Sequence, residues 1–424
     1  MQVHLAYGEQ GLDVELPDDA VVLQPQAVAG IPEPERAVAE AIAQPLGSPP
    51  LAEIVRRGNT IAIVVSDITR PVPNCVILPP ILAVLHDAGV PSDDVVVIVG
   101  TGLHRASTPK ELNRVLGAEI AGSYEVVNHD ARDAGTLSLV TTTARGVPVW
   151  INRRYLEADV RIVTGFVEPH IFAGYSGGGK GVLPGVAGAE AIMRNHAAEM
   201  LSHPKSTWCV TDGNPIFEEM RDIALLTKPS FSVNVTLNAE REITSVFAGE
   251  LVASHEAGIA QAERQYVRQI DQPFDIVVST NMGYPADLNL YQSVKGMSVG
   301  AQAVRDGGSV LLAAECRDGL GLGEYTELLT SEQSPAALLE RIHAPGFARY
   351  DQWGVQLQAM VQARADVWLH SSMSRETTEA AHLNYCPEVS ATVEELRRRH
   401  RAEHGREAAI AVLPHGHLTV PRLS

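Results

Sequence analysis

The chain has 424 residues and a mass of 45.5 kDa, which predicts two or three domains. Hydrophobic residues make up 45% of it and charged residues 20%, a composition typical of a folded protein and not of a disordered one. The net charge of −18 disfavours general binding to nucleic acid and to anionic membranes. We find no apolar run of membrane-spanning length, no signal-peptide pattern and no CxxC pair among the four cysteines, so we expect a cytoplasmic protein.

Predicted strands and helices alternate through the first part of the chain. Short strands are expected at 3–6, 12–16 and 20–23, and helices at 32–43, 51–57 and 73–88. The runs 60–65 and 95–99 are apolar and β-rich without alternation, which is typical of strands buried on both faces. Segments 124–128 and 160–163 repeat this pattern. The alternation predicts right-handed βαβ units in a mostly parallel sheet.

The β/α alternation starts again near residue 271. Between the two parts we predict helices at 187–201, 215–226 and 251–270 and strands at 231–237 and 243–247. Beyond 271 we predict strands at 274–278, 309–313, 367–370 and 408–412 and helices at 288–306, 335–342 and 393–404. The fold class is therefore α/β, with two α/β domains at 1–270 and 271–404 and the active site in the cleft between them. Whether 405–424 returns to the first domain is left open.

Polar loops follow five of the predicted strands. They are 66–71 (SDITRP), 100–105 (GTGLHR), 165–170 (GFVEPH), 281–285 (NMGYP) and 315–319 (ECRDG). Ligands of parallel α/β sheets bind beyond the carboxyl ends of the strands, so five such loops together indicate a site. Each also has an ordinary structural interpretation: Asp67 and Thr69 suit a helix cap, and His104 and His170 suit loop histidines bonded to the backbone.

The strongest local motif is GYSGGGKG at 174–181. It resembles the phosphate loop GxxxxGK[ST], but residue 181 is glycine where a serine or threonine would hold magnesium, so a triphosphate site is disfavoured. The consecutive glycines, Gly177–Gly179, let backbone N–H groups approach an anion or a flat ring closely. Lys180 is a candidate nucleophile. A flexible loop with a surface lysine remains the alternative.

Two further segments carry polar groups with helical spacing. His196 on the predicted helix 187–201 is a candidate ligand for nickel, zinc or iron, although it has no HExxH-like partner. Gln292 and Lys295 are spaced i, i+3, and Tyr291 and Lys295 i, i+4, which suits a carboxylate ligand. A solvated helix face has the same pattern.

These segments together resemble one family, the nickel-pincer-nucleotide lactate racemases. The resemblance runs through most of the chain and depends on SDITRP (66–71), GTGLHR (100–105), EPHIFAGYSGGGKGVLPG (168–185), RNH (194–196) and NLYQSVKG (289–296). It implies a Ni(II)-pyridinium-3,5-bisthiocarboxylic acid mononucleotide, the nickel-pincer nucleotide, joined covalently to Lys180 through a thioamide. It also implies dependence on the proteins that make this cofactor.

The resemblance implies a role for each matching residue. His104 and His170 are the expected acid and base, and His196 is the expected fourth nickel ligand. The expected cofactor contacts are Asp67, Ile68, Thr69, Arg70, Ser176, Gly177 and Gly178, and the expected substrate contacts are Arg70, Tyr291, Gln292, Lys295 and Trp353. In the implied reaction, a hydride leaves C2 of a 2-hydroxy acid, a 2-keto acid forms transiently, and the hydride returns to the other face.

Lactate is the expected substrate, because Arg70 and Lys295 account for one carboxylate and one oxygen. Malate would need a further cation, which Arg105 or Arg317 would have to supply, and phenyllactate or an aldonic acid would need a larger pocket. Three other functions stay open at this point: a nicotinamide dehydrogenase, although GTGLHR lacks the third glycine of GxGxxG, a phosphate-loop phosphotransferase, and a non-catalytic hydroxy-acid-binding protein.

Overall fold

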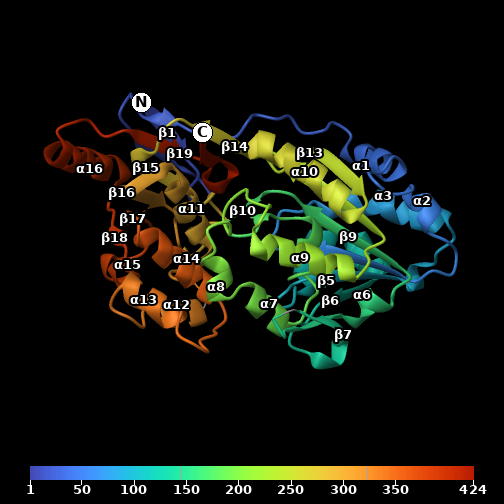
Figure 1. The fold of residues 1–424 in the computed structure, drawn as a ribbon. Coiled ribbons are helices and arrows are strands. Elements are labelled where there is room, and N and C mark those ends of the chain that lie inside the picture. Colours follow the sequence, from blue (N-terminus) through green and yellow to red (C-terminus); the bar gives the residue numbers. More distant parts are fainter. Residues whose placement is uncertain (144, 322) are drawn as a thin grey trace. The chain divides into compact units, whose positions relative to one another are not determined.

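The structure, a computed structural model, describes residues 1–143, 145–321 and 323–424 and divides into two compact α/β units (Figure 1). The central unit comprises Ala27–His196 and His203–Gln265. The terminal unit comprises Met1–Gln26, Ala197–Ser202 and Tyr266–Ser424. The two α/β units with mostly parallel sheets agree with the prediction. Residues 1–26, which were expected in the first domain, lie in the terminal unit. Residues 405–424, whose placement the sequence left open, lie there too.

The central unit contains a six-stranded sheet in the order β13-β12-β9-β4-β5-β6. Its strands are β13 (Ile243–Gly249), β12 (Phe231–Leu237), β9 (Val160–Phe166), β4 (Ile61–Ser66), β5 (Val95–Gly100) and β6 (Glu125–Asn128). All neighbours are parallel except β12 and β13. The first five residues of β4 and of β5 are buried, as the unbroken apolar runs predict. The sheet therefore aligns several carboxyl ends at one edge.

Helices and two small hairpins complete the central unit. The helices are α1 (Pro34–Ala43), α2 (Leu51–Ile54), α3 (Asn74–Asp87), α4 (Pro109–Leu116), α5 (Ala118–Ser123), α6 (Arg153–Glu157), α7 (Ala189–Asn195), α9 (Pro215–Leu226) and α10 (Leu251–Tyr266). The hairpins are β7 (Leu137–Thr142) with β8 (Pro148–Asn152), and β10 (Pro169–His170) with β11 (Gly174–Tyr175). The apolar faces of α1 and α3 bury Val38, Ile42, Ile77 and Ile81 in one core with β4 and β5.

The terminal unit contains a second six-stranded sheet, in the order β18-β17-β16-β15-β19-β3, in which all neighbours are parallel. Its strands are β18 (Asn384–Tyr385), β17 (Asp366–His370), β16 (Val304–Ala313), β15 (Phe274–Thr280), β19 (Ile410–Leu413) and β3 (Val21–Val22). Two further pairs are β1 (Gln2–Leu5) with β2 (Leu12–Glu15), and β14 (Val267–Ile270) with β20 (Val420–Leu423). Its helices are α8 (Ala198–Leu201), α11 (Leu290–Ala303), α12 (Gly323–Leu329), α13 (Pro335–Ile342), α14 (Gln352–Gln362), α15 (Arg375–Ala380) and α16 (Val389–His404).

Several predicted helices are shorter than expected, among them the one at 51–57, which ends at Ile54. The helix expected at 187–201 is broken into α7 and α8, which belong to different units. The helix expected at 251–270 ends at Tyr266, because Val267–Ile270 pairs with β20. The helix expected at 288–306 ends at Ala303, where the residues that follow enter β16.

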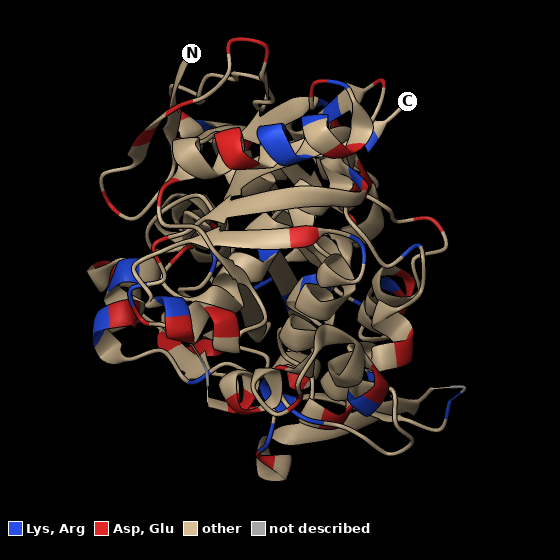
Figure 2. Ribbon diagram, turned by 90° about the vertical axis from the view of Figure 1, so that its left-hand side faces the viewer, with Lys and Arg blue, Asp and Glu red and all other residues tan. Residues whose placement is uncertain are grey.

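Most charged residues lie on helices and loops, and the strands carry few of them (Figure 2). In the part of the chain that the structure describes, no helix is both long and apolar enough to cross a membrane.

Candidate functional site

The carboxyl ends of β4 and β5 bring Asp67 and His104 together. Ser66 pairs with Gly100 across the two strands, so the loops SDITRP and GTGLHR begin side by side. Asp67 is only 5% exposed, and its Oδ2 lies 2.7 Å from His104 Nδ1. Its Oδ1 accepts hydrogen bonds from the backbone N–H and the hydroxyl of Thr69, at 3.1 and 2.6 Å. Both oxygens of this buried carboxylate therefore have partners.

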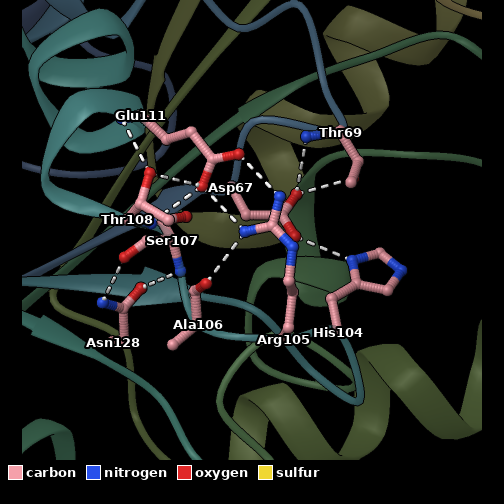
Figure 3. A network of polar contacts seen from close by, with 9 residues as sticks. All are labelled: Asp67, Thr69, His104, Arg105, Ala106, Ser107, Thr108, Glu111 and Asn128. Atoms are coloured by element: carbon pink, nitrogen blue, oxygen red, sulfur yellow. Dashed lines mark hydrogen bonds and ion pairs between the residues drawn. The ribbon is translucent and has the colours of Figure 1, made fainter.

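The environment keeps Asp67 ionised. Burial alone would raise the pKa of its carboxyl, but the hydrogen bond from His104, then those from Thr69 and the charge of Arg70, bring the pKa below its usual value. An ionised carboxylate only accepts hydrogen bonds, so His104 Nδ1 carries the proton that lies between them. The other ring nitrogen, Nε2, points away from Asp67 (Figure 3) and is left as a proton acceptor. The His104 side chain is 49% exposed, so this acceptor is accessible.

The loop that carries His104 is held in place by its own polar network (Figure 3). Arg105 donates to both carboxylate oxygens of Glu111, at 2.6 and 2.8 Å. Glu111 also completes a capping box with Thr108 at the start of α4. Asn128 on β6 bonds to the backbone N–H and carbonyl of Ser107. The Arg105 guanidinium, a candidate for the extra cation that malate would need, is thus paired with Glu111, while its side chain is 68% exposed.

His170 lies on the small hairpin β10–β11, where it pairs with Gly174. It is buried, and its Nδ1 accepts a hydrogen bond from the Ala173 N–H at 3.3 Å. An accepting Nδ1 requires the neutral ring to carry its proton on Nε2. His170 thus favours the opposite tautomer to His104.

The same hairpin is joined to the end of β9 through Ser176. The Ser176 hydroxyl donates to the Phe166 carbonyl at 2.6 Å and accepts from the Glu168 N–H at 3.0 Å. The Glu168 carboxylate lies 3.9 Å from the guanidinium of Arg70. Glu168 was not among the predicted site residues, although the motif EPH contains it.

The glycine loop is more tightly packed than the sequence indicates. Gly178–Gly181 form a short 3-10 turn, in which Gly178 and Gly179 are buried and Lys180 is half-buried. The Gly178 N–H donates to Asn234 Oδ1 at 3.0 Å. This loop is therefore not the flexible, exposed turn of the alternative interpretation. The Gly178 N–H also faces a side-chain amide and not an open space for phosphate.

His196 ends helix α7 as its C-cap and is only 6% exposed. Burial, and after it the nearby ammonium of Lys180, lower the pKa of His196 to about 3. Its imidazole is therefore neutral at ordinary pH, the form that ligates metal. The Phe172 ring makes edge contacts with both His196 and His170, at centroid distances of 5.0 and 4.6 Å. The central unit thus brings the predicted acid–base histidine, the predicted metal ligand and the predicted attachment lysine into one neighbourhood.

Across the described parts of the chain, no three His, Cys, Asp or Glu side chains gather into a metal site.

The remaining predicted residues lie in the terminal unit. Tyr291, Gln292 and Lys295 are on α11, whose first turn is capped by Asn289, and all three are half-buried. Trp353 on α14 donates from Nε1 to the Tyr291 hydroxyl at 3.1 Å. The structure therefore joins Tyr291 to Trp353, two residues distant in sequence that were predicted to share a role. Their contact with substrate stays a prediction.

Two family models match the chain in succession. The lactate racemase N-terminal domain matches residues 7–209, and the lactate racemase C-terminal domain matches residues 269–420. A lactate racemase from Thermoanaerobacterium thermosaccharolyticum is 33% identical over 369 residues, which cover 85% of each chain. A lactate racemase from Lactiplantibacillus plantarum is 34% identical over 386 residues, which cover 90% of this chain and 89% of the relative.

Two solved structures share the fold of this chain. The lactate racemase apoprotein from Thermoanaerobacterium thermosaccharolyticum aligns over 100% of both chains with a TM-score of 0.91 and 30% identity. A protein from Thermotoga maritima shares the fold, with a TM-score of 0.69 at 17% identity over 92% of this chain and 99% of that chain. From the identity and coverage of its relatives, the chain belongs to the lactate racemase family.

Proposed function

We propose that this protein is a racemase that interconverts the enantiomers of lactate, or of a closely similar small 2-hydroxy acid, with a nickel-pincer nucleotide attached to Lys180. The observation that carries the proposal is the pair of histidines in opposite tautomers, His104 and His170, in the same unit as a buried neutral His196. The naming of two relatives as lactate racemases supports the choice of substrate.

Racemisation needs a proton acceptor and a proton donor, one for each face of the substrate. His104 Nε2 takes the proton of the C2 hydroxyl, and the buried carboxylate of Asp67 stabilises the imidazolium that results. His170 carries its proton on Nε2, because its Nδ1 accepts from Ala173, and this N–H is assigned as the donor. In the reverse direction His170 is the proton acceptor and His104 the proton donor, as the principle of microscopic reversibility requires.

The chain's own residues fit the proposed cofactor. His196 supplies one neutral nitrogen ligand, Lys180 supplies an amine for the covalent bond, and the loop residues Ser176–Gly178 lie against the attachment point. The loop from Asp67 to Arg70 approaches the neighbouring segment through Arg70, which lies 3.9 Å from the Glu168 carboxylate. When bound, the group would supply a reversible hydride acceptor for C2 of the substrate. The protein binds it, orients it and keeps water away. The proteins that make the cofactor are then required for the active form.

The charge distribution supports a substrate with one carboxylate. Arg70 is 24% exposed and only loosely paired with Glu168, so it suits the carboxylate of a hydroxy acid. Arg317 is held by Glu9 and Glu315, at 3.0 and 2.7 Å, as Arg105 is held by Glu111. Both of these arginines are paired more closely with carboxylates than Arg70 is, which favours a substrate with one carboxylate, such as lactate, over malate.

The test combines three measurements on protein made in a host that produces the cofactor. Intact mass reports a covalent adduct, metal analysis reports nickel, and chiral chromatography reports conversion of L-lactate to D-lactate. We expect an adduct, near-stoichiometric nickel and conversion in both directions. A protein that binds lactate and carries the adduct without interconverting the enantiomers would refute the racemase assignment.

A further inference from the structure

Two buried polar side chains from outside the motif hold the glycine loop. Asn234 lies on β12 and His255 on α10, and both are at most 5% exposed. Asn234 Oδ1 accepts the Gly178 N–H at 3.0 Å, and His255 Nε2 lies 2.9 Å from the Ser176 carbonyl. A carbonyl oxygen only accepts, so His255 Nε2 is the donor. Each of these bonds fixes backbone within four residues of Lys180.

The glycines allow this close approach. A Cβ at Gly178 would lie 2.2 Å from His255 Nδ1, and a Cβ at Gly177 would lie 2.9 Å from Asn234 Oδ1. Both glycines have positive φ, at +50° and +81°, which disfavours any other residue as well. The run of glycines therefore has a structural reason. It lets the two side chains reach the backbone of the loop.

Neighbouring residues orient the side chains of Asn234 and His255. The Asn234 amide donates to Ser232 Oγ at 2.8 Å, which orients its carbonyl oxygen toward the loop. The His255 ring stacks on Phe217 at a centroid distance of 5.8 Å, with 27° between the planes. Burial lowers the pKa of His255 to about 4, so its ring stays neutral near pH 7. The hydrogen bonds described here for Asn234 and His255 do not involve Asp67 or His104.

We infer that Asn234 and His255 are positioning residues, which fix the glycine loop so that the Lys180 amine is held where the cofactor attaches. The inference depends on the proposed attachment at Lys180. If Asn234 and His255 had only a structural role, replacing them would change the stability of the protein and nothing else. If they position the loop, replacing them also changes the reactivity of the Lys180 amine.

The conservative and disruptive variants separate these roles. His255→Gln keeps a nitrogen donor at the position of Nε2, whereas His255→Leu keeps volume and removes the donor. The matched control is Gln265→Leu, because Gln265 is 1% exposed on the same helix and donates to the Leu237 carbonyl at 2.6 Å, away from the loop. Asn234→Asp and Asn234→Ala form a second pair, in case His255→Leu does not fold.

The first readout uses the apoprotein and trace acetic anhydride, with Lys180 acetylation measured against the exposed Lys110 by peptide mass spectrometry. We expect the Lys180 to Lys110 ratio to rise about fivefold in His255→Leu, the effect of one lost buried hydrogen bond on local opening. His255→Gln should restore the wild-type ratio, and Gln265→Leu should leave it unchanged while lowering the Tm. The second readout is the fraction of adduct in a cofactor-producing host, which should fall only in the disruptive variants.

An unchanged ratio in His255→Leu and Asn234→Ala, or an equal rise in Gln265→Leu, would overturn the inference. Failure of the proposed function has a different signature. The wild-type protein would then carry no adduct in the cofactor-producing host, while the labelling ratio would still respond to His255.

Discussion

Asp67→Asn tests the acid–base assignment most directly. The substitution keeps the size of the side chain and an oxygen for the Thr69 N–H, but it removes the charge that faces His104 at 2.7 Å. An asparagine can also turn its NH₂ toward the ring. His104 Nδ1 would then become the acceptor, and the proton would move to Nε2, the atom that has to take the substrate proton.

The expected loss follows from this one contact. A hydrogen bond to a charged group contributes about 1.5–3 kcal/mol, which corresponds to about 10- to 150-fold in rate if the bond strengthens as the imidazolium forms. The wrong tautomer adds to this loss. We therefore expect the turnover number for L-lactate to fall by at least about 100-fold, within the range by which general acid–base groups contribute to catalysis.

The assay is the initial rate of D-lactate formation across a series of pH values, measured by chiral chromatography on protein with a verified adduct and nickel content. Asp133→Asn is the matched control. Asp133 makes the same local turn, with its Oδ1 accepting from Gly135 N at 2.9 Å, but it is exposed and touches no histidine. We expect the control to keep full activity.

Wild-type rates at every pH in Asp67→Asn, with adduct and nickel retained, would refute the proposed role of this pair. A loss of nickel together with activity would instead assign Asp67 to cofactor binding.

Four further predictions follow from the site. Lys180→Ala should remove the adduct mass and activity while the Tm is retained, and an unchanged adduct mass would contradict the covalent role. His196→Ala should lower the nickel content, whereas His104→Ala and His170→Ala should keep nickel and lose racemisation; equal metal loss in all three would contradict this division. Lactate should be turned over faster than malate, phenyllactate or an aldonic acid on a chiral column, because the extra loop arginines already have carboxylate partners. The pKa of His255 is about 4 in the folded protein, against 6.5 for an ordinary histidine. Between these two pH values the unfolded chain therefore binds a proton at His255 that the folded chain does not bind. The wild-type protein should therefore lose about 2 kcal/mol of unfolding free energy from this group between pH 7 and pH 5. Urea titrations should show a smaller loss of unfolding free energy between pH 7 and pH 5 in His255→Gln than in the wild type. An equal loss would refute the assignment of this pH dependence to His255.

The repeated β/α pattern was enough to predict the parallel sheets, because strands buried on both faces are continuous apolar runs such as Ile61–Ser66. Helix ends were harder to predict. Val267 and Ile270 fit an amphipathic helix as well as a strand. Their partner strand β20 (Val420–Leu423) lies far along the chain from them. Pairing between distant segments leaves no local signal.

In the candidate site, too, residues in local motifs could be predicted, whereas residues brought in from distant segments could not. His104 and Asp67 were predicted from polar loops after buried strands, and the structure joins them directly. Asn234 and His255 were missed, because each is a single residue far from the glycine loop in sequence. Asn234 had one signal, as an amide in the otherwise largely apolar strand FSVNVTL, where a buried polar group needs a partner.

Strand β3 has a consequence for how the protein is synthesised. Val21 and Val22 pair with Ala411 and Val412, so an edge of the terminal sheet joins the first and last parts of the chain. The ribosome releases β3 long before β19 exists, and the whole central unit emerges in between. The central unit can fold early, but the terminal sheet is complete only after β19 has been synthesised. Until then its apolar strands are exposed to neighbouring nascent chains, so slow elongation before β19 or a message truncated before it should lead to aggregation.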